Sequence, residues 1–114
     1  ACKDMTSIKD FSDVTNKIVE ALCAGMHPQK IILFGSRAYG SPDTSSDIDL
    51  LIIKESSQTP YKRIIEASRL ISPYRRGWGV DLIVITPREF EDRMSINDQF
   101  LLEIVDKGKV LYAA

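Results

Sequence analysis

The stretch that most constrains the fold of this chain runs from Gly35 to Asp49 and lies between two apolar segments. Ile31-Ile32-Leu33-Phe34 precedes it, and Leu51-Ile52-Ile53 follows it. Apolar runs on both sides of a small, polar, glycine-containing stretch predict a strand, a loop with a helical turn, and a second strand. The chain is therefore expected to fold around these two strands.

Two carboxylates, Asp47 and Asp49, lie two residues apart at the start of the second predicted strand. Side chains alternate along a strand, so both carboxylates should point to one face and Ile48 to the other. Neighbouring carboxylates repel each other unless a cation lies between them. Hard cations such as Mg²⁺ and Mn²⁺ prefer oxygen ligands, so the pair predicts a metal site.

Gly35 and Ser36 directly follow the first predicted strand. Glycine allows the backbone to approach a ligand closely, and a helix start offers free N–H groups and the positive end of the helix dipole. The hydroxyl of Ser36 adds a hydrogen-bond donor, and Arg37 adds a fixed positive charge. A phosphate cradle beside metal-binding carboxylates is suited to a nucleoside triphosphate with its magnesium.

The order Gly35-Ser36, ten residues, then Asp47-Ile48-Asp49 resembles the signature of nucleotidyltransferases of the DNA polymerase beta superfamily. In its length and in the wording FGSRAYG…SDIDLLI, the chain is similar to the minimal nucleotidyltransferases, the MNT proteins that pair with HEPN partners. Many of these carry a basic residue where this chain has Tyr39, so the contacts of that turn stay open. A polar hairpin loop with surface aspartates is the alternative, which the spacing disfavours.

The resemblance implies a polymerase-beta-like nucleotidyltransferase fold of the α/β (α+β) class, with a small mixed β-sheet packed against helices. It also implies a third carboxylate. Residues 80–85 are predicted to form a third strand, and Asp81 at its start matches the family's third carboxylate. Asp47, Asp49 and Asp81 are thus expected to be catalytic residues and ligands of two Mg²⁺ ions, with ATP as substrate and Asp81 nearest the attacking hydroxyl. Mn²⁺ could replace Mg²⁺.

The other predicted elements follow from periodicity and capping signals. They are a helix over about 10–26, a strand over 30–34, a helix from Pro60 to about Ile71, a short helix after Thr86, a helix from 96 or 97 to 107, and a short strand over 110–112. On the helix that begins at Pro60, the residues Tyr61, Ile64, Ile65 and Ile71 are expected to face the sheet.

Composition narrows the classes of partner. A chain of 114 residues is expected to be a single nucleotidyltransferase domain, 1–114, and its net charge of −1 gives no general attraction to nucleic acid. No apolar run approaches the ~20 residues needed to cross a bilayer. Cys2 and Cys23 are too few and too far apart for a zinc site or a disulfide framework, and no signal peptide is recognisable. A reducing, cytoplasmic setting is therefore expected.

Arg69, Arg75 and Arg76 form a basic cluster near Tyr74 and Trp78. Such a cluster could bind phosphate, an acidic partner or single-stranded nucleic acid. The alternative, slightly favoured, is a solvated helix end whose cations interact with the dipole.

The reaction implied is nucleotidyl transfer to an acceptor hydroxyl. Larger relatives add a helical domain that binds the acceptor, for which 114 residues leave no room, so another protein or a second copy of this one is expected to present it. The MNT resemblance implies an antitoxin that adenylylates a HEPN-domain RNase on tyrosine. Two alternatives stay open: transfer to a small molecule such as an aminoglycoside or to a nucleic-acid end, and a non-catalytic module that masks its partner.

Overall fold

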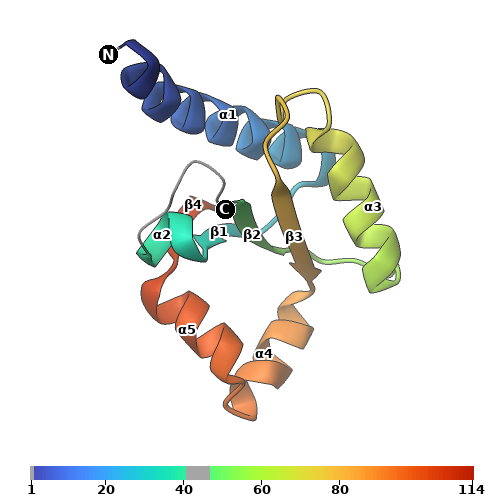
Figure 1. Cartoon of the computed structure of the whole chain (residues 1–114). Coiled ribbons are helices and arrows are strands. Elements are labelled where there is room, and N and C mark those ends of the chain that lie inside the picture. The colour runs from blue at the N-terminus through green and yellow to red at the C-terminus, as the bar shows by residue number, and fades with distance from the viewer. Residues whose placement is uncertain (1, 41–46) are drawn as a thin grey trace.

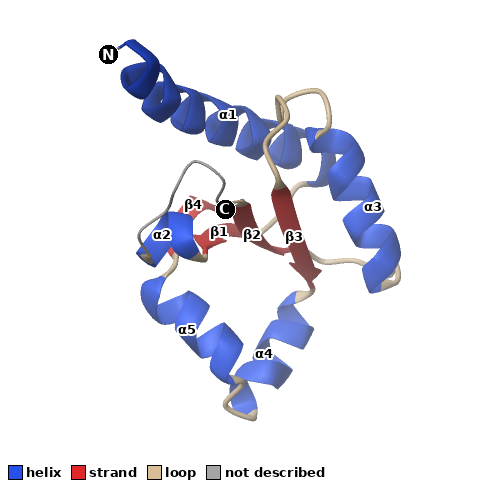
Figure 2. Cartoon of the chain, viewed as in Figure 1, coloured by secondary structure: helices blue, strands red, loops and turns tan. Residues whose placement is uncertain are grey.

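The computed structural model describes the backbone of residues 2–40 and 47–114, and the side chains of residues 11–40 and 47–114. Figures 1 and 2 show the helices and strands in one view. In chain order they are α1 (Cys2–Met26), β1 (Lys30–Phe34), α2 (Ser36–Tyr39), β2 (Ile48–Ile53), α3 (Pro60–Ile71), β3 (Val80–Ile85), α4 (Pro87–Ser95), α5 (Gln99–Lys107) and β4 (Lys109–Ala113).

Two helix starts differ from the sequence prediction. Helix α1 begins at Cys2 instead of near residue 10, because residues 3–9 contain neither proline nor glycine to stop it. Helix α5 begins at Gln99, since Asn97 has a positive φ of 56° and Asp98 caps the helix by accepting from the Leu101 amide. The Thr86 capping box of α4 is confirmed.

The strands form one mixed sheet, as predicted, and their order in it is β3-β2-β1-β4. Strand β1 pairs antiparallel with β2 and with β4, whereas β2 and β3 are parallel. The parallel pair is joined by a crossover through α3, as such pairs require. Strands β1 and β2, the most apolar of the four, are the two central strands.

Helices cover both faces of this sheet (Figure 1). On one face, α1 and α3 pack on alternate strand residues such as Leu33, Leu50 and Val84. On the other face, Leu101 and Ile104 of α5 pack on Phe34 and Leu51, with α4 alongside. The result is a three-layer arrangement with the sheet in the middle. Among the helices of the described residues, none combines the length and apolar character that a membrane span needs.

The predicted inner face of α3 was partly wrong. Tyr61 is 73% exposed and Ile64 is 37% exposed, whereas Arg63, Ala67 and Ile71 form the buried stripe. The spacing of apolar residues predicted that Tyr61 and Ile64 face the sheet. The residues that do so instead recur every four positions and begin with Arg63. Burial of that arginine is possible because its guanidinium is hydrogen-bonded.

Arg63 joins three elements on the outer side of β3. Its Nε donates to the Gln58 carbonyl at 3.0 Å, and Nη1 donates to Glu89 Oε1 at 2.7 Å and to the Val84 carbonyl at 3.4 Å. Hydrogen bonds from Arg63 and Thr86 lower the pKa of the Glu89 carboxyl. Arg63 therefore holds the end of β3 between α3 and the capping box of α4.

We expect Arg63→Met to lower the free energy of unfolding by about 2–3 kcal/mol, because a buried ion pair loses one partner. The expected loss is at the low end because the Glu89 side chain is 40% exposed and can be hydrated. Urea denaturation measures the change. Lys62→Met, which removes an exposed cation from the same helix, is the control and should have little effect. Equal stability of the two variants would contradict a joining role for Arg63.

Candidate active site

The parallel pairing of β2 with β3 brings two of the predicted carboxylates together. In the register of these strands Asp49 is the partner of Asp81, and Asp47 immediately precedes β2. Asp49 alternates with Leu50, and Asp81 with Leu82, so both acidic side chains belong to the face that α4 and α5 cover. Asp47 and Asp81 are exposed, whereas Asp49 is partly buried.

Crowding changes the acidity of the central carboxyl. Burial, the charge of Asp81, a hydrogen bond with Asp81 and the charge of Asp47 together raise the pKa of Asp49 from 3.8 to about 6. Burial disfavours the charged form of Asp49 by removing water, and the neighbouring carboxylates disfavour a further negative charge beside them. The Asp49 carboxyl is therefore close enough to both Asp81 and Asp47 to be affected by their charges.

Two glycines allow the backbone to approach these carboxylates. Gly35 has a positive φ of 76°, and a Cβ added to it would collide with Asp49 Oδ2. A Cβ on Gly79 would collide with Asp47 Oδ1, and the Gly79 carbonyl accepts a hydrogen bond of 2.8 Å from the Ile48 amide. A larger residue at either position would push a carboxylate out of the group.

The predicted phosphate cradle lies at the end of β1 beside Asp49. Phe34, the last residue of β1, pairs with Asp49 across the sheet, so Gly35 and Ser36 follow at the edge of the carboxylate group. Gly35 precedes α2, and its carbonyl accepts from the Ala38 and Tyr39 amides at 3.0 and 3.1 Å. The Ser36 residue is exposed at the start of this turn. Residues 41–46 of the signature lie outside the described residues.

Arg37 contacts two aromatic rings, one on α1 and one in the segment before β3. Its guanidinium carbon lies 5.0 Å from the centroid of the Phe11 ring and 4.8 Å from that of the Trp78 ring. Both distances are within the range of cation–π attraction. The structure thus brings Arg37 together with α1 and with the segment before β3.

The basic cluster is divided among structural contacts. Arg75 Nε donates to the Trp78 carbonyl at 3.0 Å, and Arg76 pairs with Asp13 of α1 at 3.0 Å. Arg69 is exposed in the last turn of α3. Arg75 therefore bonds within the segment between α3 and β3 and Arg76 pairs with α1, while Arg69 and Arg76 remain exposed to solvent.

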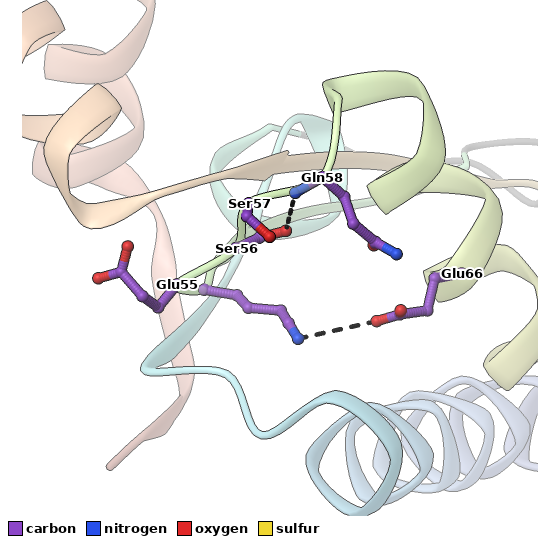
Figure 3. A pocket seen from close by; sticks show the side chains of 6 residues that line it. Glu55, Ser56, Ser57, Gln58 and Glu66 are labelled. Atoms are coloured by element: carbon purple, nitrogen blue, oxygen red, sulfur yellow. Dashed lines mark hydrogen bonds and ion pairs between the residues drawn. The ribbon is translucent and has the colours of Figure 1, made fainter.

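A shallow hollow of about 600 Å³ lies at the opposite end of β2 (Figure 3). Its lining includes Lys54 and Glu66, whose Nζ and Oε1 atoms are 3.8 Å apart and offset each other's charge. Asp47 and Asp49 precede β2 or lie near its start, whereas Lys54 follows its end. The hollow is therefore separate from the carboxylate group.

The carboxylate group fits a divalent cation in its chemistry. Among residues 2–40 and 47–114, no three acidic, imidazole or thiol groups are already gathered closely enough to hold a metal ion. Burial and, after it, the neighbouring charges of Asp81 and Asp47 raise the pKa of Asp49, and a bound cation would offset those charges. Oxygen donors of this kind suit Mg²⁺ or Mn²⁺, with Asp47, Asp49 and Asp81 as the residues that would hold it.

Residues 16–114 match the family described as "Polymerase beta, Nucleotidyltransferase". The chain belongs to the polymerase beta nucleotidyltransferase family. It is therefore a nucleotidyltransferase, and its four-stranded mixed sheet is the fold that this family predicts.

Three relatives support this assignment. The chain is 34% identical over 85 residues to "Putative protein adenylyltransferase MJ0604" of Methanocaldococcus jannaschii, a match that covers 74% of this chain and 78% of the relative. A solved "putative nucleotidyltransferase from Sulfolobus solfataricus" is 28% identical with a TM-score of 0.58, over 76% of this chain and 78% of the other. A structure described as "the toxin-antitoxin with AMP-PNP" is 27% identical with a TM-score of 0.61, over 87% and 73%.

Sequence reasoning missed the residues that support the site from a distance. The first is Gly79, which makes room for Asp47. The second is Phe11, whose ring contacts Arg37. A glycine two residues before an acidic strand residue is a signal that could have found the first. No local signal links Phe11 to Arg37.

We expect Asp49→Asn to stabilise the fold in EDTA. The folded-state pKa of Asp49 is raised from 3.8 to about 6. The folded state therefore binds the Asp49 proton more tightly than the unfolded state, and the stability gained from this is complete below pH 3.8 and lost as pH rises through about 6. At pH 7.5 the gain should be about 1–2 kcal/mol, less than the full shift implies because solvent screens a partly exposed group.

Urea denaturation of the unaltered chain and of Asp49→Asn between pH 4 and pH 8, in salt on the order of 0.1 M, measures the difference in their free energies of unfolding. The gap between them should grow across the window from about pH 4 to pH 6 set by the raised pKa of Asp49. Asp92→Asn, at an exposed position on α4, is the control. A constant gap across the pH range would show that Asp49 is not strained by its neighbours.

Proposed function

We propose that this nucleotidyltransferase transfers AMP from ATP, with Mg²⁺, to a hydroxyl side chain of a partner protein, and that the partner is a HEPN-domain RNase toxin modified on tyrosine. The chain would then act as an antitoxin. The observation that carries the proposal is the acidic group of Asp47, Asp49 and Asp81 beside the Gly35-Ser36 turn. That arrangement suits phosphate and metal handling together.

The relatives narrow the acceptor class. One is named as a protein adenylyltransferase, and another was solved as a toxin-antitoxin with AMP-PNP, an ATP analogue. Every described helix and strand of this chain belongs to the one sheet or packs on it, and none builds a separate layer for an acceptor. A partner protein that brings its own hydroxyl to the carboxylates is in keeping with both observations. The HEPN identity and the tyrosine come from the sequence resemblance.

In the proposed reaction the acceptor oxygen forms a bond to the α-phosphorus of ATP. The bond between that phosphorus and the bridging oxygen breaks, and pyrophosphate leaves with its electron pair. The hydroxyl proton passes to a carboxylate, for which the family resemblance favours Asp81. Gly35 and Ser36 would hold the triphosphate, and Arg37 would add positive charge near it. Bound divalent cations would supply charge neutralisation at both the attacking and leaving oxygens.

The setting of the proposed reaction remains the cytoplasmic one expected from sequence. ATP and a toxin that cleaves RNA would both be available there. A small molecule or a nucleic-acid end is the alternative acceptor, and the mass and activity measurements distinguish these from a protein.

We expect the purified chain, with ATP and Mg²⁺, to increase the mass of a HEPN partner by whole AMP units. Intact-mass spectrometry measures the change, and EDTA or Asp47→Asn should abolish it because both remove metal binding. The modified partner should remain inactive as an RNase after the two proteins are separated. An unchanged partner mass with RNase activity that returns on separation would support masking instead.

The acceptor class is tested in parallel by replacing the partner with an aminoglycoside or with a nucleic-acid oligonucleotide. AMP on either of these, with none on the partner, would leave the nucleotidyl-transfer chemistry in place but overturn the protein acceptor. The Asp47→Asn variant should be inactive on every acceptor if the same carboxylates act in each case. Thermal unfolding of the variant should show that its fold is retained.

We expect Ser36→Ala to weaken binding of Mg²⁺ with AMP-PNP by roughly 10- to 100-fold, the equivalent of one hydrogen bond to a charged group. Titration calorimetry measures the affinity. Ser36 is exposed and at the first turn of α2, so its loss should not disturb the core. Ser57→Ala, an exposed serine beyond the far end of β2, is the control. Unchanged affinity in Ser36→Ala would show that the hydroxyl does not bind phosphate.

A further inference from the structure

Arg37 lies against two aromatic side chains that come from distant parts of the sequence. Phe11 belongs to α1, and Trp78 to the segment between α3 and β3. Their ring centroids are 5.6 Å apart with an interplanar angle of 54°, and the Arg37 guanidinium lies within 5.0 Å of both centroids. A cation within about 6 Å of an aromatic ring face is attracted to it. We call Phe11, Arg37 and Trp78 the aromatic clamp.

The Trp78 side of the clamp lies in a hydrogen-bonded turn, which one ion pair and the Trp78 ring connect to the rest of the fold. The Trp78 carbonyl accepts from Arg75 at 3.0 Å, and its amide donates to the Arg75 carbonyl at 2.8 Å. The neighbouring Arg76 pairs with Asp13 on α1 at 3.0 Å. The half-buried Trp78 ring also packs against the core between the sheet and α1. The ring is thus a fixed surface against which Arg37 can be held.

The clamp residues Trp78 and Arg37 lie one and two residues along the chain from glycines that pack against carboxylates. Gly79 follows Trp78, packs against Asp47, and accepts from the Ile48 amide at 2.8 Å. Ser36 precedes Arg37, and Gly35 before it packs against Asp49. The two segments that carry Arg37 and Trp78 therefore each contain a glycine that packs against an acidic side chain. Movement of Arg37 relative to Trp78 would change the spacing between the α2 turn and the carboxylates.

We propose that Phe11 and Trp78 are positioning residues of the nucleotide site: by holding Arg37 they fix the Gly35-Ser36 turn relative to Asp47 and Asp49. This inference rests on the proposed function, because it assigns a purpose to that turn. The clamp links α1 on one face of the sheet to a carboxylate group on the other. Phe11 and Trp78 act through Arg37 and not by contact with the substrate.

A double-mutant cycle on nucleotide binding tests this role. Arg37→Met and Trp78→Leu should each weaken binding of AMP-PNP with Mg²⁺ by about 3- to 20-fold, the range that cation–π contacts span. The double variant should bind no more weakly than the weaker single variant, because both substitutions break the same contact. Trp78→Phe should restore most of the affinity, since it keeps an aromatic face, and it also guards against a Trp78→Leu protein that fails to fold.

Two control variants match the clamp residues in type. Arg69→Met removes an exposed arginine of α3, and Tyr74→Leu removes an exposed aromatic ring from the segment that carries Trp78. Both should bind the nucleotide as the unaltered chain does. Weakening that is additive in the double variant, or that appears equally in the controls, would overturn the proposal. Normal binding by Trp78→Leu beside weak binding by Arg37→Met would also overturn it, because Arg37 would then act without the clamp.

Fluorescence provides a second measurement that does not depend on turnover. Trp78 is the single tryptophan of the chain, so its emission reports the clamp directly. Arg37→Met should change that emission without nucleotide, and Arg69→Met should not. Unchanged emission in Arg37→Met would overturn the contact. If nucleotide binding and emission follow the clamp while no AMP reaches a partner protein, the clamp stands and the proposed acceptor fails.

Discussion

The parallel pairing of β2 with β3 is the constraint on which the rest of this structure depends. It sets Asp49 directly beside Asp81, with Asp47 one step before the same strand. Burial and the two neighbouring carboxylates raise the pKa of Asp49 to about 6, so this arrangement opposes the charged state that prevails at neutral pH. Such strain at one place is tolerated when the surrounding structure over-determines it.

The surrounding structure supplies that support through apolar burial and close backbone contact. Strands β1 and β2 are buried on both faces, between α1 and α3 on one side and α4 and α5 on the other. Gly35 and Gly79 bring backbone against the carboxylates where no side chain would fit. The acidic group therefore stands at the edge of a rigid core, which keeps its geometry while leaving Asp47 and Asp81 exposed to ligands.

Two arginines of this protein, Arg63 and Arg37, have different structural roles. Arg63 is buried and satisfied by two carbonyls and Glu89, and it holds the far end of β3. Arg37 is held by aromatic faces at the near end of the same sheet. Both positions suit a planar, always charged group that can hydrogen-bond in a fork or stack on rings. Charge counts alone therefore say little about which arginines meet a ligand.

Much of this protein could be determined from its sequence, because the decisive signals are local. The strands on either side of the stretch from Gly35 to Asp49 and the helices that begin at Pro60 and after Thr86 followed from neighbouring residues, and the mixed sheet followed from the family resemblance. The inward stripe of α3 and the clamp did not, since burial of Arg63 and stacking of Arg37 depend on partners 26 and 41 residues away, at Glu89 and Trp78. Periodicity describes the spacing of apolar residues within one segment. Only the tertiary structure decides which distant residues that segment contacts.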